Sequence, residues 1–134
     1  MHSVTRVIHF CYGHRLMDYA GKCRHPHGHN GKLEVTIRKD SLDRLGMVMD
    51  FEDIKATVQR WVDDELDHKM LLSSKDPLVA VLRGLGEPVV VIEGNPTAEN
   101  IAKLVFERAQ AMKLPVASVR LWETVNSYAE HDGD

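Results

Sequence analysis

Residues 32–39 alternate between apolar and polar side chains, and no other stretch constrains the fold as strongly. Leu33, Val35 and Ile37 are apolar, while Lys32, Glu34, Thr36 and Arg38 between them are polar or charged. This period of two predicts a β-strand with one buried face and one face in water. The chain must therefore supply a layer that covers the buried face.

Two amphipathic helices are predicted to form that layer. The first is expected to begin after a capping Asp50 and to end at Leu66, and the second to begin after a capping Thr97. Apolar residues recur at helical spacing in both segments. The predicted stripes are Phe51, Ile54, Val58, Trp61 and Val62 in the first helix, and Ile101, Ala102, Val105 and Ala109 in the second.

The remaining segments complete an α+β pattern. Further strands are predicted over 4–12, 89–92 and 116–123, a short helical turn over 76–82, and a disordered tail over 129–134. We predict one domain, residues 1–134, with an antiparallel four-stranded sheet and two helices packed on one face. The uncovered sheet face of so thin a domain favours assembly into a homo-oligomer.

Composition narrows the classes of partner. The 134 residues carry a formal net charge of -3 with neutral histidines, so the basic surplus expected of a nucleic-acid-binding protein is absent. No apolar run is long enough to cross a bilayer, and we expect no membrane partner and a cytoplasmic location. A local basic group is expected to hold an anionic substrate such as a phosphate ester: Arg15, Lys22, Arg24 and Lys32.

The segment Cys-Arg-His-Pro-His-Gly-His-Asn at residues 23–30 suggests a metal site. His27 and His29 lie two apart, so an extended backbone places both rings on one face. His14 follows the first strand and comes near them if the strands pair antiparallel. Three imidazoles with one open position suit a catalytic zinc ion. His25 is an alternative ligand, ranked below His14 because the proline after it disturbs the strand.

A thiol and an acid–histidine pair suggest proton transfer. Cys23 lies between two basic residues that favour its thiolate form, whereas Cys11 ends an apolar run and is expected to be buried and inert. In Asp67-His68 the carboxylate could orient the imidazole, which would then set the protonation of Cys23. Neighbouring residues do not easily contact each other, so Glu123 could orient His68 instead. The simpler interpretation of the pair is a helix C-terminus.

Glu123 ends the last predicted strand. It is either a surface charge or a carboxylate that accepts two adjacent N–H donors from a ring such as a pterin or guanine.

Taken in order, these segments resemble the 6-pyruvoyl-tetrahydropterin synthase and 6-carboxytetrahydropterin synthase family across nearly the whole chain. The resemblance lies in Phe10-Cys11-Tyr12-Gly13-His14-Arg15-Leu16, Cys23-x-x-x-His27-Gly28-His29-Asn30, Met49-Asp50-Phe51, Leu66-Asp67-His68, Pro96-Thr97-Ala98-Glu99-Asn100 and Glu123-Thr124. Two positions depart from the family. Gly31 stands where an aromatic residue is common, and Cys11 where a small residue is common.

The resemblance implies a tunnelling fold, in which trimeric rings close a barrel, two rings stack into a hexamer and sites lie between subunits. It also implies residue roles. By resemblance the zinc ligands are His14, His27 and His29, the general base is Cys23, the relay is His68 supported by Asp67, the pterin anchor is Glu123, and Thr97 and Glu99 line the pterin pocket.

The implied activity is a zinc-dependent lyase acting on 7,8-dihydroneopterin triphosphate. The spacing from Cys23 to His27 resembles the branch that releases acetaldehyde and triphosphate and forms 6-carboxy-5,6,7,8-tetrahydropterin for queuosine synthesis. The sister branch eliminates triphosphate to give the 6-pyruvoyl product. Two other interpretations remain: an unrelated zinc hydrolase in which Cys23 is dispensable, and a non-catalytic module with four-coordinate structural zinc.

Overall fold

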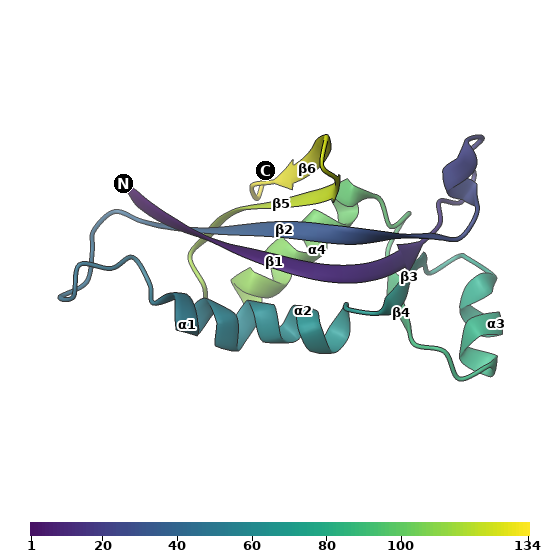
Figure 1. The fold of residues 1–134 in the computed structure, drawn as a ribbon, viewed down its shortest axis with the longest axis horizontal. Coiled ribbons are helices and arrows are strands. Elements are labelled where there is room, and N and C mark those ends of the chain that lie inside the picture. The colour runs from purple at the N-terminus through teal and green to yellow at the C-terminus, as the bar shows by residue number, and fades with distance from the viewer.

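Six strands form one sheet, and the helices of the core pack on one of its faces (Figure 1). The computed structural model describes all of residues 1–134. The strands are β1 (His2–His14), β2 (His27–Lys39), β3 (Lys69–Ser73), β4 (Val89–Ile92), β5 (Val116–Thr124) and β6 (Ser127–His131). The helices are η1 (Lys22–Arg24), α1 (Phe51–Ile54), η2 (Lys55–Gln59), α2 (Arg60–Glu65), α3 (Leu78–Gly84) and α4 (Ala98–Ala111).

The prediction of four antiparallel strands is wrong in number and direction. The strand order is β4-β3-β1-β2-β5-β6, and β3 runs parallel to both β1 and β4. Strand β3 was missed because its adjacent Leu71 and Leu72 are both fully buried and show no alternation. Strand β6 pairs with β5, so residues 129–131 of the expected disordered tail lie in the sheet.

The core confirms an α+β fold with helices on one face of the sheet. In β1 and β2 the alternate residues that face the helices are buried, including the predicted Leu33, Val35 and Ile37. The main core residues are Ile8, Phe10, Tyr12, Leu33, Val35, Ile37, Ile54, Val58, Val62, Leu66, Ile101, Ala102, Val105, Phe106, Ala109, Val119 and Leu121. Phe51 is the exception to the predicted stripes, because 48% of its surface is exposed.

The first predicted helix is a continuous run of α1, η2 and α2 with a π-helical centre. Its fully buried residues, from Ile54 to Leu66, recur every four positions. Residues four apart drift around a regular α-helix, which has about 3.6 residues per turn. The wider π turn reduces this drift and keeps the buried residues against the sheet.

Both predicted helix caps are confirmed. The Asp50 carboxylate accepts a hydrogen bond from the Glu52 amide at 2.9 Å, and the Thr97 hydroxyl accepts one from the Asn100 amide at 3.1 Å. The predicted inner face of α4 is fully buried from Ile101 to Ala109. No helix combines the length and apolarity needed to span a bilayer.

Candidate metal centre and active site

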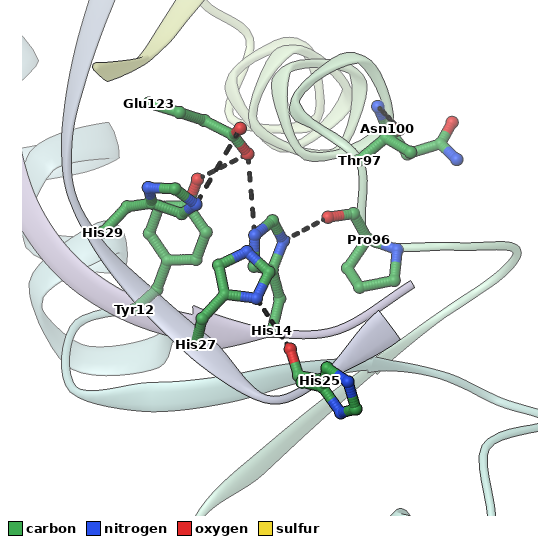
Figure 2. Close-up of polar contacts among 9 residues, drawn as sticks. All are labelled: Tyr12, His14, His25, His27, His29, Pro96, Thr97, Asn100 and Glu123. Carbon is green, nitrogen blue, oxygen red and sulfur yellow. Dashed lines mark hydrogen bonds and ion pairs between the residues drawn. The ribbon is translucent and has the colours of Figure 1, made fainter. Parts of the chain in front are cut away.

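The end of β1 and the start of β2 bring three imidazoles together (Figure 2). The antiparallel register pairs Tyr12 with His29 and His14 with His27. Residues that pair across two strands present their side chains on the same face, so all four rings lie together. One nitrogen from each of His14, His27 and His29 lies within 4.8 Å of the other two. We refer to these three residues as the histidine cluster.

Backbone carbonyls orient two rings of the histidine cluster. The Nδ1 of His14 donates to the Pro96 carbonyl at 2.7 Å, and the Nδ1 of His27 donates to the His25 carbonyl at 2.8 Å. A carbonyl only accepts hydrogen bonds, so each Nδ1 carries a proton, and the neutral form of either ring offers its lone pair at Nε2. Burial lowers the pKa of His14, which favours the neutral form that a metal requires.

The histidine cluster fits a divalent cation. The Nε2 atoms of all three residues are buried and have no hydrogen-bond partner. Buried polar atoms are rarely left unpaired, because the lost hydration is costly. Three imidazole nitrogens with one position left open form a donor set typical of catalytic zinc.

His25 is not part of the histidine cluster. It contributes its carbonyl to His27, whereas its exposed ring lies outside the group (Figure 2). The structure therefore gives His25 a supporting contact and not the ligand position considered from the sequence.

Glu123 lies beside the histidine cluster, at the end of β5 (Figure 2). Its Oε1 is 3.8 Å from Nε2 of His14, and its Oε2 is 3.9 Å from Nε2 of His29. The Tyr12 hydroxyl donates to Oε1 at 3.0 Å. Burial, together with the Glu123 charge, raises the pKa of Tyr12, so this hydroxyl remains a donor.

Thr97 and Glu99 do not contact the histidine cluster. The Thr97 hydroxyl caps α4, and Glu99 is exposed in the first turn of that helix. The residue before them, Pro96, reaches the cluster through its carbonyl. Asn95 fixes this loop, because its side chain accepts from the Met17 amide at 2.8 Å and donates to the Met17 carbonyl at 3.0 Å.

Asp67 and His68 contact each other, contrary to the expectation for neighbouring residues. The Asp67 Oδ2 and the His68 Nδ1 are 2.8 Å apart. A left-handed backbone at His68, with φ of 62°, turns its ring back toward the carboxylate. Burial opposes ionisation of Asp67, but hydrogen bonds from the Cys11 amide and the His68 ring lower its pKa. Asp67 can therefore orient His68 without Glu123.

Within one chain, Cys23 and His68 do not meet. Cys23 is half-buried in η1 and has no side-chain hydrogen bond to either His68 or the histidine cluster. The His68 side chain is 77% exposed. A cavity of about 760 Å³ lies between His68 and the strand ends, and the thiol in its lining is Cys11.

The predicted basic residues occupy different surroundings in this chain, although Arg15 and Arg24 line one pocket. Arg15 forms a two-pronged ion pair with the buried Asp76, in which its Nε donates to Oδ2 at 2.7 Å. Lys32 lies over the Trp122 ring, 5.0 Å from its centroid. Arg15 is therefore a structural cation in this chain.

Sequence reasoning missed Tyr12 and the supporting loop of Asn95 and Pro96. A signal for Tyr12 was present, because residues two apart in a strand share a face and Tyr12 precedes His14 by two positions. The role of the Pro96 carbonyl could not be recognised from the sequence, because every residue has a backbone carbonyl.

Comparisons of the sequence with known proteins point to one family. A sequence model of the family described as 6-pyruvoyl tetrahydropterin synthase matches residues 3–134. A protein of Rickettsia bellii named 6-carboxy-5,6,7,8-tetrahydropterin synthase is 37% identical over 137 aligned residues, which cover 97% of this chain and 99% of that protein.

Solved structures extend the likeness to the fold. A crystal structure of an uncharacterized protein from Wolinella succinogenes superposes with a TM-score of 0.83 and 28% identity, covering 99% of this chain and 98% of that one. The 6-pyruvoyl tetrahydropterin synthase of Caenorhabditis elegans gives a TM-score of 0.74 and 26% identity, covering 98% and 95%.

Proposed function

Because this chain belongs to the 6-pyruvoyl tetrahydropterin synthase family, we propose that it is the zinc-dependent lyase of the 6-carboxy branch. The substrate is 7,8-dihydroneopterin triphosphate, and with water it yields 6-carboxy-5,6,7,8-tetrahydropterin, acetaldehyde and triphosphate for queuosine synthesis. The observation that carries the proposal is the cluster of three buried, unpartnered Nε2 atoms beside Glu123. The 6-carboxy name of the Rickettsia bellii relative supports this branch.

His14, His27 and His29 would hold the zinc ion, which when bound supplies a Lewis acid for a hydroxyl of the substrate side chain. Glu123 accepts the adjacent N–H groups of the pterin in a fork. Thr97 and Glu99 would line the pterin pocket from the start of α4.

Cys23 is the proposed general base, and His68 is its proton relay. Asp67 accepts from Nδ1 of His68 and is itself fixed by the Cys11 amide, so the free Nε2 has a defined direction. A thiolate within reach of that Nε2 would pass its acquired proton to the imidazole.

Cys23 and His68 do not contact each other within one chain, which supports a site shared between copies of the chain. Asp67 holds the His68 ring in place, although 77% of the His68 side chain is exposed to solvent. Ordering an exposed side chain costs conformational entropy, so a partner outside this chain is the simplest reason for it. We propose a homohexamer, a dimer of trimers, in which His68 of one copy approaches Cys23 of a neighbouring copy. The open face of the sheet would be covered in the same assembly.

A product assay tests the function. Zinc-loaded protein is incubated with 7,8-dihydroneopterin triphosphate, and acetaldehyde is followed by its NADH-dependent reduction while the pterins are separated by chromatography. Acetaldehyde and the 6-carboxy product in equal amounts are expected. A 6-pyruvoyl product without acetaldehyde would place the chain in the sister branch, and full turnover by Cys23→Ala would favour a zinc hydrolase.

A further inference from the structure

The Tyr12 phenol is a buried donor at the site with a single acceptor. Only 3% of the residue is exposed, and its hydroxyl donates to Oε1 of Glu123. Aromatic neighbours fix the ring on two sides. It stacks on Phe10 with centroids 5.0 Å apart and meets the edge of His14 at 5.2 Å. The hydroxyl is therefore held at one point in space.

Glu123 has no comparable restraint of its own. Its side chain is 27% exposed, and no hydrogen bond other than that from Tyr12 reaches its carboxylate. A flexible side chain at this exposure can turn its charge into water, where the charge is best solvated. The Tyr12 bond opposes this movement and keeps one oxygen near each of two Nε2 atoms, those of His14 and His29.

We propose that Tyr12 is a positioning residue, whose hydroxyl holds the Glu123 carboxylate against the histidine cluster so that this charge strengthens cation binding there. The inference rests on the proposed function, which assigns the cluster to zinc and Glu123 to the pterin. In addition to binding the pterin, Glu123 would then favour the cation by its charge, and Tyr12 is the residue that positions this charge. Hydrogen-bonded partners around metal ligands commonly alter metal affinity by about 10- to 100-fold.

Zinc affinity measured by competition with a chromophoric chelator tests the proposal without any turnover. Tyr12→Phe keeps the stacked ring and removes the donor, and we expect zinc affinity to fall about 10-fold. Glu123→Ala is expected to lower it at least as far. In the Glu123→Ala background, Tyr12→Phe should have no further effect, because the group that it directs is gone.

Tyr128→Phe is the matched control. This tyrosine lies on β6 with 44% of its surface exposed, its ring against Arg120 and Trp122. The control variant should bind zinc as the native chain does. Native affinity in Tyr12→Phe would overturn the proposal, as would an equal loss with and without Glu123, which would indicate simple packing.

The proposal and the proposed function can fail separately. If Tyr12→Phe lowers zinc affinity only when Glu123 is present, but the native chain releases no acetaldehyde, the role of Tyr12 stands and the lyase function is wrong. A chain that forms the 6-carboxy product while Tyr12→Phe binds zinc normally retains the lyase and loses the Tyr12 role.

Discussion

Gly31 lies directly opposite Phe10 in the β1–β2 ladder, and the missing side chain leaves the space that two stacked rings occupy. A Cβ built on Gly31 would lie 2.8 Å from the Phe10 ring and 3.0 Å from the Tyr12 ring. We therefore expect Gly31→Ala to lower the free energy of unfolding by about 1–3 kcal/mol, the usual effect of overpacking. Chemical denaturation measures it.

Gly84→Ala is the control for that substitution. Gly84 lies in α3, and nothing stands within 4 Å of an added Cβ. Alanine should be neutral there or stabilise the chain by up to about 1 kcal/mol. Equal effects at the two glycines would show that the ring packing around Gly31 does not limit stability.

Removing one imidazole of the histidine cluster should greatly weaken zinc binding. We expect His14→Ala to weaken zinc binding by more than the roughly 100-fold that outer partners contribute, because a direct ligand is lost. His25→Ala retains the backbone carbonyl that orients His27, so its zinc content should stay native. Metal analysis of the purified variants makes the comparison, and retention of zinc by His14→Ala would exclude it as a ligand.

The shared site can be tested by mixing inactive variants. Cys23→Ala and His68→Ala should each lack activity, whereas hybrids assembled from both should regain it at about one quarter of the sites, where both side chains are intact. Cys23→Ala mixed with His14→Ala should remain inactive if, as we propose, Cys23 and the histidine cluster of one copy serve the same site. Turnover without recovery in the first mixture would indicate that each chain works alone.

The ion pair of Arg15 with Asp76 should make stability fall in acid. Arg15 holds the pKa of Asp76 below its ordinary value of 3.8, so the pair stabilises the fold above that pH. This contribution is lost as the pH falls through the lower, folded-state pKa. Asp76→Asn should cost about 3 kcal/mol near neutral pH, and less below pH 3.8, as measured by denaturation.

An exposed ion pair provides the control for Asp76. Asp64 is 64% exposed and faces Arg60 one helical turn away, at 3.8 Å. Asp64→Asn should change stability by less than about 0.5 kcal/mol at any pH. A flat difference between native chain and Asp76→Asn across the acid range would contradict the role of the buried pair.

Local patterns in the sequence predicted the elements that carry periodicity or caps. The strand with Leu33, the helix capped by Asp50 and the helix capped by Thr97 all formed, because each buries one regular face. Strand β3 escaped prediction because its pairing with β1 and β4 is set by partners distant in sequence. Its own apolar run fits helix and strand equally.

The sequence predicted the candidate metal ligands, but it predicted fewer of the contacts that hold the surrounding side chains in place. The sequence placed His14 near His27 on condition that their two strands pair antiparallel, and the structure shows that pairing. The contact of Asp67 with His68 depends on the left-handed backbone of His68, which the residue types at these positions did not predict. The pairing of Arg15 with Asp76 depends on loops brought together only by the complete fold.

The three unpartnered nitrogens in the histidine cluster link metal supply to the lifetime of the folded chain. Each is deprived of water in the native state and regains it on unfolding, so an ion that binds only the native state shifts that equilibrium by mass action. Free zinc at about 100 times its dissociation constant would add about 2.7 kcal/mol. A cell starved of the metal would then lose the protein to proteolysis as well as losing its activity.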